Sequence, residues 1–313
     1  MKKRKIKVML ILLLILAVMS GCTKTLTDNK NKPVKNENTG QTLTKNILCK
    51  PTNKETIKIY EENNVKIEKL PECKDYKISS GKYEGLWTTF FVKPLAYVLL
   101  KIGNFVKNYG LSVIIVSLII RLIAFPLTKK ATNQSEVMKK AQPELNKIQK
   151  KYADKKDQES MIKQNQELMA VYKKYNISPM SGCLFAFLQL PIFIAFFEAV
   201  QRTPVIFEDK FLGLQLGTTP SVGITTATFY SYIVLMLIIA VTTYVSFKMN
   251  SMTSMNNMDD PTMKMMPLMM SGMIIVTAAF MPTGLGIYWV TSNLFTIFQN
   301  MLLKRRKEVH GKA

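Results

Sequence analysis

The sequence has very few of the residues on which most enzymes depend. Its only histidine, His310, lies in the basic C-terminal tail. That excludes serine–histidine or cysteine–histidine catalysis and any site with several histidine ligands to a metal. The chain has no G-x-x-x-x-G-K-[ST] phosphate loop, which excludes autonomous nucleotide-driven pumping, and no pair of aspartates in an apolar run. We therefore expect no catalytic residue, no metal site and no bound cofactor.

Acidic residues are also scarce, with 21 Asp and Glu against 43 Lys and Arg and a net charge of +22. This excess would suit nucleic-acid binding, but the basic residues gather in particular loops. Lysines recur throughout residues 128–176, and residues 304–313 form a basic tail, whereas residues 201–228 carry only Arg202 and Lys210. By the positive-inside rule, the first two segments lie in the cytoplasm and the third lies outside.

Apolar residues concentrate in runs that approach the roughly 20 residues of a membrane-spanning helix. The runs are residues 111–127, 180–200, 229–247, 265–281 and 284–303. The sequence thus predicts an all-α polytopic membrane protein with five spans, which form a core over residues 107–303. Five spans with an external N-terminal part and a cytoplasmic C-terminus place the two lysine-rich segments inside and residues 201–228 outside, as the positive-inside rule requires.

The N-terminus has the pattern of an export signal. Basic residues precede a short apolar stretch, and Ser20-Gly21-Cys22 follows it. This end resembles a bacterial lipobox, which implies that residues 1–21 are a lipoprotein signal peptide and that Cys22 carries the lipid. The alternative is an uncleaved signal anchor. Both place residue 23 and those after it outside.

Residues 22–85 are polar and contain too little apolar surface for a large core. Within them, Thr56–Tyr60 and Val65–Lys69 alternate at period two, which predicts a small β-hairpin. Cys49 and Cys73 flank it in what should be an oxidising compartment. They either form a disulfide that stabilises the hairpin or remain two free thiols.

Residues 86–106 are apolar and aromatic but are interrupted by Lys93, Pro94 and Lys101. Counting them as a sixth span would put the lysine-rich segment outside. We therefore predict an amphipathic helix that lies on the outer membrane face.

Residues 128–176 have helical periodicity without an apolar run. Two apolar stripes, one before and one after a polar break at residues 153–157, predict an antiparallel helical hairpin in the cytoplasm, kinked or restarted near Pro143. Its charges form a solvated face, or its tip binds a partner.

Arg121 lies inside the first apolar run. An arginine at the centre of a spanning helix costs about 2.5–3.5 kcal/mol on insertion scales. The other runs contain one carboxylate, Glu198, near the end of a run. This favours an arginine solvated in a polar cavity lined by several helices over an ion pair. The alternative is that Arg121 extends to the cytoplasmic interface.

Three ordered strings carry a resemblance to a known family. SLIIRLIAFPLT at 117–128, ISPMSGCLFAFLQLPIF at 177–193 and MPTGLGIYWVTSNLFTIFQN at 281–300 resemble the YidC-type membrane protein insertases. With its lipobox, the chain is similar to the five-span form of Gram-positive-type bacteria.

The resemblance implies a positively charged hydrophilic groove, open to the cytoplasm and the lipid, which contains Arg121, Gln189 and Trp289. It also implies an insertase and chaperone in the bacterial cell membrane. Its partners would be nascent membrane proteins and the Sec translocon, together with the ribosome if the hairpin and the basic tail bind it. The alternatives are a small-solute channel or transporter and an assembly scaffold. No internal repeat of the transporter kind is visible.

Overall fold

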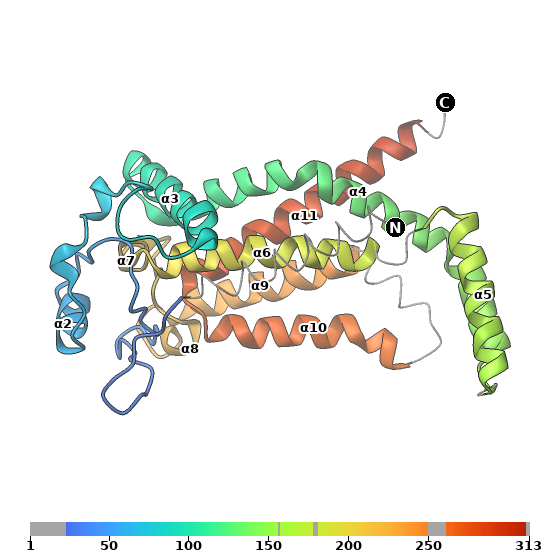
Figure 1. Ribbon diagram of the computed structural model, residues 1–313, viewed down its shortest axis with the longest axis horizontal. Helices are drawn as coiled ribbons and strands as arrows, with labels where there is room; N and C mark the ends of the chain where they lie inside the picture. Colours follow the sequence, from blue (N-terminus) through green and yellow to red (C-terminus); the bar gives the residue numbers. More distant parts are fainter. Residues whose placement is uncertain (1–22, 156, 178–180, 250–260, 311–313) are drawn as a thin grey trace. The chain divides into compact units, whose positions relative to one another are not determined.

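The chain is mostly helical and divides into two compact units. The computed structural model describes residues 23–155, 157–177, 181–249 and 261–310 (Figure 1). The first unit takes in Met1–Ser117, Leu190–Leu237 and Thr277–Trp289, and the second takes in Leu118–Gln189, Ile238–Val276 and Val290–Ala313. The boundary crosses five of the described helices, and each of these five contributes residues to both units.

The helices differ widely in length. The long ones are α3 (Lys93–Val106), α4 (Tyr109–Lys151), α5 (Gln158–Lys174), α6 (Ser181–Gln201), α9 (Phe229–Met249), α10 (Pro261–Ala279) and α11 (Thr283–His310). The short ones are α2 (Lys54–Glu62), α7 (Pro204–Glu208), α8 (Pro220–Gly223), η1 (Ile67–Lys69), η2 (Cys73–Asp75) and the π-helical η3 (Thr88–Val92). Strands β1 (Lys210–Phe211) and β2 (Leu214–Gln215) pair antiparallel, with Lys210 opposite Gln215. A helix therefore occupies each of the five predicted apolar runs.

Residues 23–87, here named the N-terminal module, have a small apolar core of their own. The core consists of Leu26, Leu43, Ile47, Tyr60 and Ile67. Isolated antiparallel bridges join Thr25 to Thr44 and Lys35 to Thr42. The Tyr60 hydroxyl donates to the Thr44 carbonyl at 3.0 Å, so the core holds one end of this bridged segment.

The predicted β-hairpin in this module is wrong. Residues 54–62 form α2, and residues 67–69 form η1. The Asn53 side chain accepts hydrogen bonds from the amides of Glu55 and Thr56, which caps the helix start. Thr56 and Tyr60, four residues apart, share the buried face. Helix capping and one buried face at helical spacing therefore outweigh the period-two alternation.

Helix α3 packs one face into the first unit and exposes the other. Ala96, Leu99 and Gly103 are buried, whereas Phe105 is exposed. Lys107 adopts a left-handed conformation with φ 54°, and the chain then turns into α4. The Ser112 hydroxyl of α4 donates to the Leu99 carbonyl at 2.6 Å, which fixes the turn between the two helices.

Three helices in the described part of the chain are long and apolar enough to cross a membrane, judged by length and composition alone. They are Thr88–Val106, Tyr109–Met138 and Phe229–Met249, and Gln189–Gln201 is a shorter apolar helix. The side chains of residues 181–188 and 265–267, within two of the predicted runs, lie outside the description. Thr88–Val106 qualifies although we predict it to be interfacial, because length and composition cannot separate the two placements.

The second unit contains a helical hairpin made by the end of α4 and by α5 (Figure 1). Ala141, Leu145, Val171 and Ile177 form its buried core. α4 continues without a break through Pro143, so of the two predicted alternatives, a kink or a restart, the restart is wrong. Its apolar stripe crosses the proline, so packing against α5 stabilises the helix there despite the lost amide.

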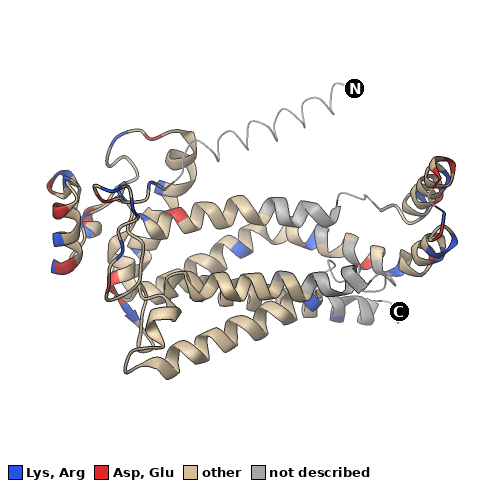
Figure 2. Cartoon of the chain, turned by 90° about the horizontal axis from the view of Figure 1, so that it is seen from below, with Lys and Arg blue, Asp and Glu red and all other residues tan. Residues whose placement is uncertain are grey.

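Charged residues are distributed unevenly among the helices. The apolar helices show few charged residues along their lengths, whereas α2 and α5 carry both acidic and basic residues (Figure 2). In the hairpin, Lys151 pairs with Glu167 and Lys174 with Glu144, each at 2.6 Å. These ion pairs connect the two helices of the hairpin at its solvated face.

Candidate functional site

The second unit buries polar side chains on helices that are otherwise apolar. They come from α4, α9, α10 and α11 and include Arg121, Thr128, Thr242, Thr243, Ser246, Ser271, Thr291, Ser292, Thr296, Gln299 and Asn300. A helix buried only for packing would place aliphatic side chains at these positions. The unit therefore has a polar interior, to which four separate helices contribute.

Hydrogen bonds connect these helices to one another. The Thr128 hydroxyl on α4 donates to Gln299 Oε1 on α11 at 3.1 Å. The Asn293 amide on α11 donates to the Thr243 hydroxyl on α9 at 2.9 Å. Such bonds between membrane helices stabilise modestly, by about 0.6 kcal/mol on average. They connect α11 to α4 and to α9 through polar contacts.

Part of this interior has unused hydrogen-bonding capacity. Ser271 Oγ, Ser292 Oγ and Asn300 Nδ2 are buried and have no hydrogen-bond partner among the described residues. A buried polar atom without a partner costs about 1–3 kcal/mol. A chain keeps several such atoms at low cost where water or a bound polar group can reach them.

Arg121 belongs to this polar interior. It lies on α4 with 8% of its surface exposed, whereas the next two residues, Leu122 and Ile123, are 62% and 74% exposed. One face of the helix is thus apolar and outward, and the other brings a guanidinium inward. The burial of Arg121 agrees with its predicted place in a polar interior.

Gln189 and Trp289 fall in different units. Gln189 is half-buried on α6 in the second unit, and Trp289 is half-buried on α11 in the first. Trp289 packs edge-on against Phe193 of α6, with 5.4 Å between ring centroids. Tyr288 stacks on Phe196 at 4.2 Å. Trp289 therefore belongs to an aromatic contact between α6 and α11. In the sequence, this contact is visible only as aromatic residues in the strings at 177–193 and 281–300.

The burial of two charged residues, Lys93 and Arg202, could not be foreseen from the sequence. Arg202, expected only as a loop residue, is fully buried. Its Nη2 lies 2.7 Å from Glu84 Oε2, and its Nε donates to the Asn46 carbonyl at 2.7 Å. No local pattern indicates this burial, because both partners come from a distant part of the chain.

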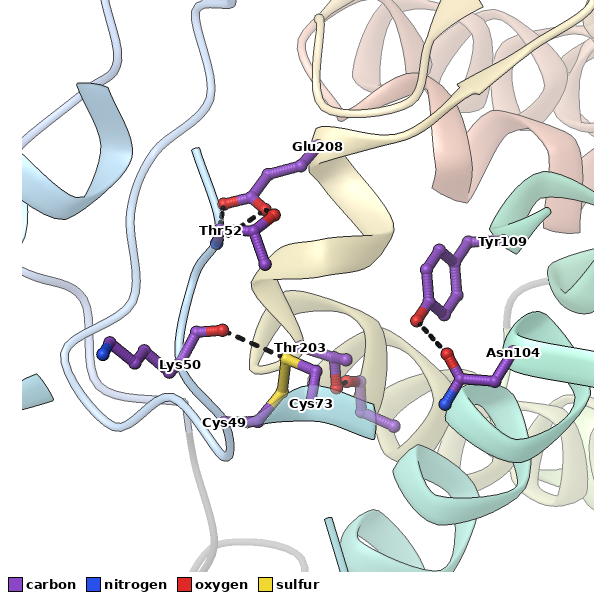
Figure 3. Close-up of a disulfide and its surroundings, with 9 residues drawn as sticks. Cys49, Lys50, Thr52, Cys73, Asn104, Tyr109, Thr203 and Glu208 are labelled. Atoms are coloured by element: carbon purple, nitrogen blue, oxygen red, sulfur yellow. Dashed lines mark hydrogen bonds between the residues drawn. A yellow bond between two sulfur atoms is a disulfide. The ribbon is translucent and has the colours of Figure 1, made fainter. Parts of the chain in front are cut away.

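Cys49 and Cys73 are joined by a disulfide in the N-terminal module (Figure 3). Both are buried, and Cys73 Sγ lies 3.3 Å from the Lys50 carbonyl oxygen. Nearby, Glu208 of α7 accepts hydrogen bonds from the backbone amide and the hydroxyl of Thr52. The predicted lipid-bearing residue, Cys22, and the signal residues 1–21 lie outside the described residues.

In the described part of the chain, no three His, Cys, Asp or Glu side chains gather where they could hold a metal ion. The polar interior of the second unit consists of hydroxyls, amides and one guanidinium. Side chains of these kinds can form hydrogen bonds with polar and anionic groups.

Known proteins match most of the chain. Residues 101–310 match the family described as "60Kd inner membrane protein". "Membrane protein insertase YidC" of Oceanobacillus iheyensis is 38% identical over 229 residues, which cover 71% of this chain and 85% of the relative. The chain belongs to the YidC family. The resemblance carried by the three sequence strings is thereby confirmed.

Other YidC-family proteins agree with this assignment. "Membrane protein insertase MisCA" of Bacillus subtilis is 37% identical over 219 residues, which cover 70% of this chain and 79% of the relative. A solved structure, "Active YidC insertase crystal structure with the first transmembrane domain resolved", aligns at 20% identity with a TM-score of 0.44. It covers 78% of this chain and 49% of the solved one, and the family assignment does not depend on it.

Proposed function

We propose that this chain is an insertase and chaperone that moves membrane proteins into the lipid bilayer through a polar groove around Arg121. Relatives named membrane protein insertases, matched over 85% and 79% of their lengths, support the activity. The observation that carries the site is the burial of Arg121 in a polar interior, on a helix whose other face is apolar.

The polar interior suits the most difficult step of insertion. A client protein must carry a polar segment across the bilayer, where each unsatisfied backbone group costs several kcal/mol. Hydroxyls, amides and a guanidinium inside the bilayer replace part of the lost hydration. The positive charge of Arg121 attracts carboxylates and carbonyl oxygens of that segment, so the polar crossing becomes shorter and its barrier lower.

The apolar part of the client supplies the driving force. Burial of each CH₂ group in lipid contributes about 0.8 kcal/mol, so a client helix of ordinary length gains enough to leave the groove without nucleotide hydrolysis. Gln189 offers a further polar contact on α6. Trp289, packed against Phe193, offers an aromatic surface for the apolar part of the client.

The topology follows from charge and chemistry. Five spans, α4, α6, α9, α10 and α11, leave the lysine-rich hairpin and the tail in the cytoplasm and the N-terminal module outside. The disulfide supports the external placement of the module, because such bonds persist in oxidising compartments. A lipid on Cys22 would anchor the start of the module to the bacterial cell membrane.

Helix α3 fits an interfacial place on the outer surface better than a sixth span. Its buried face packs inside the first unit, while Lys101 and Phe105 of α3 are exposed, as is Phe90 of the preceding η3. Exposed aromatic rings and lysines are typical of a helix at the level of the lipid headgroups.

Nascent membrane proteins are the clients in this proposal. The Sec translocon and the ribosome are further partners, and the solvated hairpin of α4 and α5 and the basic tail are the surfaces that would meet them. The basic tail would bind phosphates of ribosomal RNA, whereas a tail that serves only topology would not.

The test is insertion of a small single-span client into liposomes that contain the purified protein. Arg121→Ala should abolish most insertion, and Arg121→Lys should restore much of it, because the charge is kept. Lys130→Ala is the matched control, since it removes one positive charge from an exposed position on the same helix.

Other outcomes identify the alternatives. Normal insertion by Arg121→Ala would refute the groove mechanism for that client. A wild-type protein that inserts nothing but conducts a small solute would indicate a channel or transporter. A protein that neither inserts nor conducts would indicate an assembly scaffold.

A further inference from the structure

The C-terminal end of α6 is attached to the N-terminal module through Arg202, whose side chain is fully buried. Its Nη2 donates to both carboxylate oxygens of Glu84, at 2.8 and 2.7 Å, and its Nε donates to the Asn46 carbonyl. Its Nη1 lies 3.5 Å from the Thr88 hydroxyl. One planar guanidinium thus contacts three separate points of the segment from Asn46 to Thr88, which a lysine cannot reproduce.

Neighbouring groups complete this buried cluster. The Trp87 indole donates to Glu198 Oε1 of α6 at 3.2 Å. Lys93, buried at the start of α3, donates from Nζ to the carbonyls of Ser80 and Lys82, at 2.7 and 3.1 Å. The module, α3 and α6 therefore meet at one set of buried charged and polar side chains.

Backbone contacts continue the attachment. The Leu48 amide donates to the Arg202 carbonyl at 2.7 Å, and the Thr219 amide donates to the Thr39 carbonyl at 2.8 Å. Glu208 accepts from Thr52, as Figure 3 shows. The N-terminal module is thus docked on the end of α6 and on the segment that follows it, and Arg202 is a fully buried charge in this contact.

The docking bears on the aromatic contact between α6 and α11. Phe193 and Phe196, which pack on Trp289 and Tyr288, lie on α6 within three turns of Arg202. A rigid helix transmits displacement at its end to this face. An undocked module would therefore leave α6 less firmly held where it meets α11.

We propose that Arg202 is a positioning residue that locks the N-terminal module onto α6, and that insertion of clients needs the locked module. That Arg202 locks the module depends only on the hydrogen bonds and burial described here. That insertion needs the locked module rests on the proposed insertase function. Arg202 does not itself contact the client in this proposal.

The locking is measured by hydrogen exchange of the Leu48 amide in the full chain in liposomes. Removal of one partner from a buried ion pair is strongly destabilising, so Arg202→Gln should accelerate this exchange by about a hundredfold. The Ile57 amide, bonded inside α2 to the Asn53 carbonyl, should change far less. The exchange rate of Arg202→Lys should lie between those of wild type and Arg202→Gln, because lysine keeps the charge but lacks the planar set of guanidinium donors.

Two further variants keep the test decisive. Glu84→Gln removes the partner charge from a side chain that is 35% exposed, so it applies if Arg202→Gln fails to fold. It should accelerate Leu48 exchange by about tenfold. Lys58→Gln is the matched control, because it breaks an exposed ion pair with Glu62 in the same module and should change nothing.

Insertion by the same variants tests the second half. We expect the insertion rate to be lower than wild type in Arg202→Lys and lowest in Arg202→Gln. It should stay at the wild-type rate in Lys58→Gln. Unchanged Leu48 exchange in Arg202→Gln would overturn the lock. Faster Leu48 exchange together with normal insertion in Arg202→Gln would show that insertion does not need the locked module. If the wild type inserts nothing, the proposed function fails, and exchange alone still decides whether Arg202 locks the module.

Discussion

Removal of the Cys49–Cys73 disulfide should destabilise the N-terminal module by an amount that follows from its place in the chain. The two cysteines are separated by 24 residues. Closing a loop of that size removes about 12 cal/mol/K of entropy from the unfolded chain, or about 3.5 kcal/mol at 25 °C. Cys49→Ala with Cys73→Ala should therefore raise the open population of the module by about a few hundredfold.

Cleavage by chymotrypsin after Tyr60 measures this opening, because Tyr60 is a core residue with 2% of its surface exposed. At low protease concentration the cleavage rate follows the open population. Wild-type protein treated with a strong reductant should approach the double variant, and the double variant should not respond to the reductant. A double variant cleaved as slowly as oxidised wild type would show that the disulfide contributes nothing to the stability of the module.

Two predictions concern the hairpin of α4 and α5. Leu145→Ala, in its buried core, should destabilise the packing of α5 by about 2–5 kcal/mol, seen as faster exchange of the Val171 amide, whereas Lys147→Ala at an exposed position should not. Hydrogen bonds from Lys174 and Tyr175 hold the pKa of the Glu144 carboxyl below its usual range, and a bond from Lys151 does the same for the pKa of Glu167. Carboxylates with lowered pKa stabilise the hairpin at neutral pH and lose that contribution as pH falls through the lowered pKa. Exchange in α5, corrected for its intrinsic pH dependence, should therefore accelerate only below the ordinary glutamate pKa of about 4.3. Glu144→Gln with Glu167→Gln should remove that acceleration, and a double variant that still shows it would contradict the assignment.

The long helices could be predicted from the sequence because they depend on local composition, and Arg121, which attracted attention for the same reason, is buried. The apolar runs, nearly long enough to cross a bilayer, form helices. An arginine within such a run is unusual in any membrane protein. The hairpin of α4 and α5 was predictable for the same reason, since its apolar stripes repeat at helical spacing. The helix continues through Pro143 because of packing against α5, which the sequence does not display.

The N-terminal module was harder to predict because its structure depends on distant contacts. Alternation at residues 56–60 suggested a strand, but the Asn53 cap and the burial of Tyr60 against Leu26 and Leu43 select a helix. The Asn53 cap was visible in the sequence and could have favoured α2. Arg202 was not predictable, because it binds residues more than a hundred positions away.

In the proposed mechanism, client polypeptide occupies the polar interior of the second unit during insertion. The test uses a client with a photoreactive residue in its polar segment, arrested part-way into liposomes and then irradiated. We expect crosslinks to buried polar positions such as Arg121, Thr243 and Ser292, and fewer crosslinks when the photoreactive residue is in the apolar helix of the client. If a client inserts efficiently while its polar segment crosslinks only to exposed positions, such as Ile123, the polar segment does not pass through this interior.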